Sequence, residues 1–216
     1  MDRLPLFSLN TVLFPGALLP LHVFEERYKL MIGRCLDERF PFGVVLIRSG
    51  DEVCGPAEPF DVGTTARIAR LQRLPDGRMN LVALGRRRFR IFALDHSEPY
   101  LQGDVEYLAS EDTDSPGVDE EAQRVAALFA EQFRLSMAVT AQWVRRLDLP
   151  RDPNRLADFV ASHMELEPAA KQELLETLSV PARLRREAEL LGDLIRALTE
   201  RWEEQRRNRF AGAALN

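Results

Sequence analysis

The sequence predicts an α+β protein in which strands come first and helices follow. Between residues 42 and 108, short apolar runs such as "FGVVLIR", "MNLVALG" and "RRFRIFAL" are separated by Gly- and Pro-containing turns. After the polar segment "SEDTDSPGVDEE", apolar residues recur every three or four positions almost to the end of the chain. We therefore expect two domains, a β-rich one at residues 1–112 and a helical bundle at residues 113–216.

The chain begins with an apolar stretch, "LPLFSLNTVLFPGALLPLHVFEERYKLM". A signal peptide needs a basic start and an unbroken apolar run of about 7–15 residues, and a membrane-spanning helix needs about 20. Here Asn10, Pro15 and Pro20 interrupt the run. We expect instead two short strands around a turn at "FPG", followed by a helix from about Glu25. The apolar stripe of this helix would comprise Phe24, Tyr28, Met31, Ile32, Cys35 and Leu36.

Charge and cysteine content restrict the class of protein. The net charge of −5 and the pI near 5.4 disfavour a dedicated nucleic-acid binder, which is usually basic. The two cysteines, Cys35 and Cys54, are too few for a disulfide framework and form no C-x-x-C motif. We therefore expect a cytoplasmic protein that does not bind a membrane, with Cys35 as a buried thiol.

No catalytic motif is found in the sequence. A P-loop requires a Gly-Lys dipeptide, which is absent, and so is the G-x-S-x-G motif of serine hydrolases. The only lysines are Lys29 and Lys171, and we expect both to be solvated rather than paired with a nucleophilic serine. His22, His96 and His163 lack the spacing of metal ligands. The sequence thus predicts neither an enzyme nor a cofactor or metal site.

Two groups of residues could bind a partner. The first is apolar and surrounds the "FPG" turn, and its members would belong either to the core or to an exposed binding patch; it consists of Phe14, Leu18, Leu19, Val23, Phe24 and Tyr28. The second lies in "GRRRFR" and would either contact phosphates or form the outer face of a strand paired with local acids, the interpretation we favour; it consists of Arg86, Arg87, Arg88 and Arg90.

The last helix carries an apolar seam with heptad spacing. The seam comprises Leu184, Ala188, Leu191, Ile195, Leu198 and Trp202. It would pack within the bundle, and it could also mediate a homodimer.

The stretches quoted above, together with "GPAEPFDVGTTARIARLQRLPDGRMNLVALGRRRFRI", resemble the amino-terminal domain of the Lon ATP-dependent proteases, and especially bacterial proteins made of that domain alone. The most specific match is P-x-x-x-L-P-L-H-x-F-E-x-R-Y, from Pro15 to Tyr28. The resemblance implies a PUA-like, curled antiparallel β-barrel or sheet with one early helix, followed by a helical bundle. It also implies a region that engages substrate polypeptides, helps to assemble a ring and carries no catalytic residue. The chain departs from the family pattern at Ser8, where a proline is common.

Three functions remain to be weighed. The first is a non-catalytic module that binds unfolded or extended polypeptide segments. The second is an RNA- or nucleotide-binding module that uses the arginine run, which the acidic composition disfavours. The third is a hydrolase that acts without ATP, and no group of residues in the sequence supports it.

Overall fold

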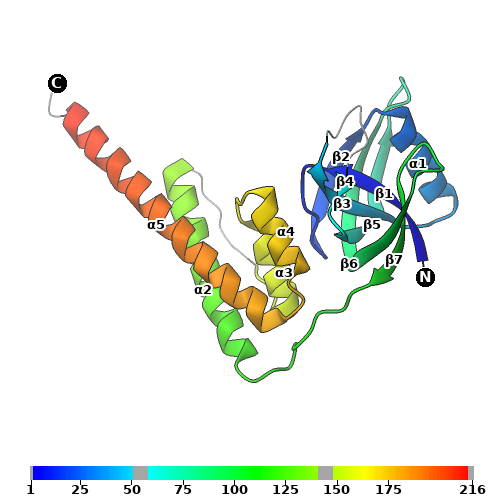
Figure 1. The fold of residues 1–216 in the computed structure, drawn as a ribbon. Helices are drawn as coiled ribbons and strands as arrows, with labels where there is room; N and C mark the ends of the chain where they lie inside the picture. Colours follow the sequence, from blue (N-terminus) through cyan, green and yellow to red (C-terminus); the bar gives the residue numbers. More distant parts are fainter. Residues whose placement is uncertain (1, 51–57, 141–147, 214–216) are drawn as a thin grey trace. The chain divides into compact units, whose positions relative to one another are not determined.

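The computed structural model describes residues 2–50, 58–140 and 148–213, and it confirms the α+β class (Figure 1). The chain forms two compact units. The first contains residues 1–111 and 161–178, and the second contains residues 112–160 and 179–216. The expected cut near residue 112 is thus only one of three places where the chain passes between units, because residues 161–178 group with the strands.

The strands of the first unit form a barrel. They are β1 (Asp2–Leu9), β2 (Leu18–Val23), β3 (Phe42–Ser49), β4 (Glu58–Pro59), β5 (Val62–Arg73), β6 (Met79–Asp95) and β7 (Gln102–Tyr107). Their order is β1-β7-β6-β5-β3-β4, and β1 also pairs with β3, which closes the ring. All pairs are antiparallel as expected except β1–β3, which is parallel. A parallel pair needs a long connection, and β2 with helix α1 (Glu26–Asp37) supplies it.

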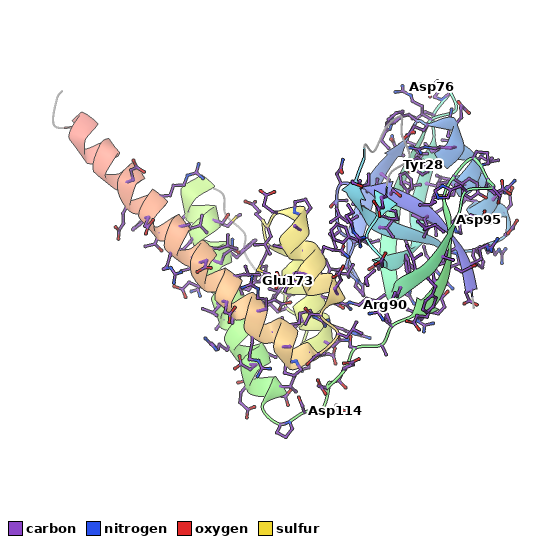
Figure 2. All side chains as sticks on the ribbon, viewed as in Figure 1. Tyr28, Asp76, Arg90, Asp95, Asp114 and Glu173 are labelled. Carbon is purple, nitrogen blue, oxygen red and sulfur yellow. The ribbon has the colours of Figure 1, made fainter. Side chains whose placement is uncertain are left out.

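Helix α1 carries most of the predicted apolar stripe, but Phe24 lies before the helix begins and is 49% exposed. Tyr28, Met31, Ile32 and Cys35 are buried in the main core cluster of the barrel unit. The ring of Tyr28, labelled in Figure 2, stacks on Phe7 with ring centroids 3.9 Å apart. Burial of Cys35, followed by the nearby charge of Glu38, raises the pKa of its thiol to about 11. Cys54 lies outside the described residues.

Two turns occur where the sequence predicts them. At "FPG", the N–H of Ala17 donates to the carbonyl oxygen of Phe14 at 3.1 Å, and Gly16 takes a φ of +81°. This is the arrangement of a type II turn, with Pro at its second position and Gly at its third. At "LPDGR", the N–H of Leu74 donates to the carbonyl oxygen of Arg78 at 2.8 Å, and this loop joins β5 to β6.

Helix α4 (Pro168–Glu176) belongs to the barrel unit because its polar contacts bind it to β5 and β6. Arg88 donates from Nε to the carbonyl oxygen of Leu175 at 2.9 Å, and Gln172 donates from Nε2 to the carbonyl oxygen of Val62 at 2.9 Å. Leu174 and Leu175 are both buried. The local sequence predicts that this helix belongs to the helical bundle. Its long-range contacts with β5 and β6 instead place it in the barrel unit.

The second unit is helical. It contains α2 (Val118–Thr140), most of α3 (Pro153–His163) and α5 (Val180–Ala213), and α2 packs along α5. Leu184, Ala188 and Leu191, the first half of the predicted seam, are buried in this unit. The later seam residues are only half-buried; they are Ile195, Leu198 and Trp202.

A buried charge lies within the second unit. Arg183 is fully buried, and its Nη2 lies 2.7 Å from Asn154 Oδ1 and 3.6 Å from Asp158 Oδ1.

None of the described helices is both long enough and apolar enough to cross a bilayer.

Candidate functional site

The six predicted apolar residues do not lie on one surface. Phe14, Val23 and Tyr28 are core residues, at most 5% exposed. Leu19 is half-buried and packs against the core cluster. Only Leu18 and Phe24 are exposed, at 65% and 49%. The remaining surface is therefore smaller than the predicted group, and it starts on the outer side of β2.

The alternation of side chains along β2 explains this division. Successive side chains of a strand point to opposite faces. Leu19, Leu21 and Val23 point toward the core, and Leu18, Pro20 and His22 point outward. Phe24 follows the strand and continues the outer row, with its ring centroid 6.0 Å from that of His22.

The arginine run also divides between two environments. Arg88 lies on the outside of the barrel, but it is only 3% exposed because α4 covers it. The exposed Arg87 places its guanidinium 4.2 Å from the ring centroid of Tyr107. Arg90, labelled in Figure 2, lies 3.6 Å from a carboxylate oxygen of Glu106. The expected row of Arg86, Arg88 and Arg90 on one solvent-facing side of the strand does not form.

The register of three strands builds one continuous outer face around Leu18. Leu18, Pro20 and His22 of β2 stand opposite Leu84, Val82 and Asn80 of β6. On the other side of β6, its residues Leu84, Val82 and Asn80 stand opposite Arg67, Arg70 and Gln72 of β5. These nine residues and Phe24 form a surface that we call the β2 face. It consists of Leu18, Pro20, His22, Phe24, Asn80, Val82, Leu84, Arg67, Arg70 and Gln72.

The β2 face is apolar on one side and basic on the other. Leu18 and Pro20 are exposed, their partners Leu84 and Val82 are half-buried, and Arg67 and Arg70 are exposed. His22 Nδ1 lies 2.6 Å from Asn80 Oδ1, which fixes the polar end of the apolar strip. Sequence reasoning missed Pro20, Val82, Leu84, Arg67 and Arg70, although the period-2 patterns of "LLPLHV" and "MNLVALG" contain the signal for the apolar members.

Strand β2 has a free edge. Among the described residues, β2 pairs only with β6. The N–H of Gly85 donates to the carbonyl oxygen of Ala17 at 2.9 Å, so residue 17 is at a hydrogen-bonded position. Because such positions alternate along an antiparallel pair, Leu18, Pro20 and His22 direct their backbone groups to the free edge. Pro20 has no N–H, so the edge lacks its central donor.

The described residues show no arrangement typical of a catalytic or metal site. No cluster of three or more His, Cys, Asp or Glu side chains able to hold a metal occurs among them. Lys29 is paired with Glu26 at 2.5 Å. Lys171 hydrogen-bonds at 3.4 Å to the carbonyl oxygen of Ser162 rather than to its hydroxyl. Partial burial lowers the pKa of Lys171, and the charge of Glu165 opposes that shift.

Comparison with known proteins identifies the family. The family model described as "ATP-dependent protease La (LON) substrate-binding domain" matches residues 3–193. This chain belongs to the LON substrate-binding domain family. The matched residues correspond to the domain that gives this family its name.

Two longer relatives of this LON domain carry the name Lon protease. The chain is 30% identical over 191 residues to "Lon protease" of Anaeromyxobacter dehalogenans (strain 2CP-C), covering 87% of this chain and 23% of that protein. It is 33% identical over 192 residues to "Lon protease 2" of Myxococcus xanthus, with the same two coverages. The LON domain described here thus spans about a quarter of the length of these relatives.

Solved structures share the fold of this LON domain. A Lon N-terminal domain protein from Xanthomonas campestris is 26% identical, with a TM-score of 0.64 over 86% of this chain and 96% of that one. The N-terminal domain of a Mycobacterium avium complex Lon protease is 23% identical, with a TM-score of 0.65 over 90% and 98%. The fold expected from the resemblance is therefore confirmed.

Proposed function

We propose that this chain is a non-catalytic module that binds unfolded or extended polypeptide segments on the β2 face. The observation that carries the proposal is the exposure of Leu18 (65%) and Phe24 (49%) on one side of an edge strand, in a member of a substrate-binding family. Contiguous exposed apolar surface marks an interaction site. Leu18 and Pro20 begin such a strip, and Phe24 lies at its far end beyond His22. Val82 and Leu84 extend the same strip.

The affinity follows from the size of the strip. Burying a Leu or Phe side chain contributes about 1.5–3 kcal/mol, and an extended chain loses conformational entropy when it binds. We therefore expect micromolar or weaker binding. Weak binding suits a module that must capture a segment and release it.

We propose that the segment lies over the face and does not extend the sheet. Strand addition relies on main-chain hydrogen bonds along a free edge. Pro20 removes the central donor of the β2 edge, and prolines on edges typically block such pairing. The exposed side chains of Leu18 and Phe24 would then supply most of the contact.

We also propose where this protein binds polypeptides and what happens to them. The 216-residue chain would bind polypeptides in the cytoplasm, indifferent to ATP, and leave them uncleaved. The alternative is an RNA-binding module that uses the predicted arginine run. In this run Arg88 is buried, Arg87 lies over Tyr107 and Arg90 is paired, so only Arg86 is exposed without a contact among the described residues. We therefore place it second.

The test is fluorescence anisotropy of a labelled, permanently unfolded polypeptide, compared with labelled single-stranded RNA at two salt concentrations. We expect saturable polypeptide binding that changes little with salt. In the variant Leu18→Ser/Phe24→Ser, affinity should fall at least about tenfold, since two large apolar contacts are lost.

The matched control is Phe92→Ser/Leu94→Ser. These residues are also exposed on the barrel unit, at 52% and 39%, but they lie at the other end of β6. This variant should bind as the unaltered protein does. Equal losses in both double variants would mean that binding is non-specific, and RNA binding that collapses with salt, without polypeptide binding, would favour the alternative.

A further inference from the structure

The basic side of the β2 face carries two arginines that no carboxylate of the described residues neutralises. Several arginines of the barrel unit lie against carboxylates: Arg3 is 2.7 Å from Asp95, and Arg78 is 2.6 Å from Asp76. By contrast, neither Arg67 nor Arg70 has an ion pair or side-chain hydrogen bond within the described residues. Both are exposed on β5, where a register shift between Ile68 and Arg70 allows two residues three positions apart to lie on the same outer face.

The geometry puts these two charges beside the apolar strip. Leu18, Leu84 and Arg67 form one row across three strands, and Pro20, Val82 and Arg70 form the next. Neighbouring strands are about 4.8 Å apart, and outward residues two positions apart on a strand are separated by about 6.7 Å. A segment seated over β2 and β6 therefore has two guanidinium groups along one flank, within reach of its own side chains.

A polypeptide with carboxylates fits this flank better than a nucleic acid does. Arginine forms strong, often bidentate hydrogen bonds with carboxylates. A single-strand nucleic-acid site usually combines a basic groove with several stacking aromatic rings. Here the central positions are Leu18, Pro20, Val82 and Leu84, which match apolar side chains. The only aromatic rings of the face, His22 and Phe24, lie together at one end of it.

We propose that the β2 face prefers extended segments in which Asp or Glu residues adjoin apolar ones, with Arg67 and Arg70 binding the carboxylates. The proposal rests on the function proposed above and specifies its substrate class. It runs against the overall charge of the chain, which is −5 and would by itself favour basic partners. A preference for acidic segments must therefore come from local charge.

The test uses labelled peptides of equal length with the same Leu and Phe positions. The intervening residues are all Ser, all Glu or all Lys, and a fourth peptide has Glu but no apolar residue. We expect the Glu–apolar peptide to bind about fivefold more tightly than the Ser–apolar peptide, from two exposed charge pairs, and the Lys–apolar peptide to bind most weakly. This advantage should shrink between about 0.1 M and about 1 M salt, where the Debye length falls from about 10 Å to about 3 Å.

Two charge-matched variants locate the effect. Arg67→Gln/Arg70→Gln should bind the Glu and Ser peptides equally. Arg185→Gln/Arg201→Gln removes the same charge from α5, where both side chains are exposed, and should keep the preference. Urea denaturation confirms that each variant is folded.

The outcomes separate the two proposals. If the Ser–apolar peptide binds, and Leu18→Ser/Phe24→Ser abolishes that binding, the function stands. An equal affinity for Ser and Glu peptides, or an equal loss in both arginine variants, then overturns the acidic preference alone. Absence of binding by every apolar peptide overturns both. Displacement of the Glu peptide by single-stranded RNA, dependent on Arg67 and Arg70, would assign the flank to phosphates instead.

Discussion

The backbone of Gly85 lies directly against the carbonyl oxygen of Phe14: a Cβ at residue 85 would be 2.2 Å from that oxygen. This contact holds the "FPG" turn against β6, with the N–H of Gly16 donating to the carbonyl oxygen of Gly85 at 2.9 Å. Because β2 starts at the end of this turn, the contact fixes the register that turns Leu18 outward.

Replacing Gly85 should therefore damage both the fold and the β2 face. We expect Gly85→Ala to destabilise the protein by about 1–3 kcal/mol, as overpacking does, and to weaken polypeptide binding. Gly33→Ala is the control, because its added methyl group meets nothing within 4 Å in α1. In a helix that change stabilises by about 0.5–1 kcal/mol. Urea denaturation measures both, and equal effects would show that the Phe14 contact is unimportant.

Arg88 should act in stability rather than in nucleic-acid binding. Arg88→Met leaves the carbonyl oxygen of Leu175 without its donor, and an unsatisfied buried group costs about 1–3 kcal/mol. Amides of α4 should then exchange faster with solvent, as measured by hydrogen exchange. Arg86→Met, at an exposed position of the same strand, should change stability by less than about 0.5 kcal/mol. Unchanged exchange in α4 would contradict this role.

The seam of α5 should contain two functionally different parts. Leu191 is fully buried within the helical unit, so Leu191→Glu should unfold that unit by burying an unpaired charge. We propose that any homodimer uses the half-buried Leu198 and Trp202. Leu198→Glu should then remain folded and become monomeric in analytical ultracentrifugation, with Glu200→Gln, at an exposed position, as the control. A wild-type protein that is already monomeric would rule out the dimer.

The mode of polypeptide binding can be tested through the peptide backbone. If a segment lies over the β2 face, N-methylation at alternate residues of the peptide should change its affinity less than about threefold, because no ladder hydrogen bonds are lost. If it adds a strand beside β2, methylating one set of alternate residues should reduce binding strongly, at about 0.5–1.5 kcal/mol per bond. Methylating the other set is the internal control, since those N–H groups point away from the edge.

Burial of the Cys35 thiol should make the stability of the fold decrease at high pH. Its folded pKa of about 11 lies above the unfolded value of about 8.5, so the fold favours the neutral thiol. Its contribution to stability is complete below the unfolded pKa and is lost as the pH rises toward the folded one. In a Cys54→Ser background, the stability lost between pH values of about 8 and 10.5 should be larger with Cys35 than with Ala at that position. Equal losses in urea denaturation would contradict the burial of the thiol.

The local structure of this protein could be predicted from its amino-acid sequence alone. Alternation and turn residues defined the strands and the "FPG" and "LPDGR" turns, and the helical period of Tyr28, Met31 and Cys35 defined the inner side of α1. The fold as a whole was predicted from the stretches that resemble the Lon amino-terminal domain, of which the motif between Pro15 and Tyr28 is the most specific. These features depend on residues close together in the chain, where periodicity and backbone preference act directly.

The solvent accessibility of these residues depends on tertiary contacts and could not be predicted from the sequence. Phe14 and Leu18 belong to one apolar stretch, yet Phe14 is fully buried and Leu18 is 65% exposed on the outer side of β2. Arg88 is withdrawn from solvent by α4, which lies 87 residues further along the chain at Leu175. The row of Leu18, Leu84 and Arg67 likewise joins three distant segments. Burial and cross-strand neighbours depend on the register between such segments. The periodicity of each strand shows which of its residues share a face, but not which distant residues stand opposite them.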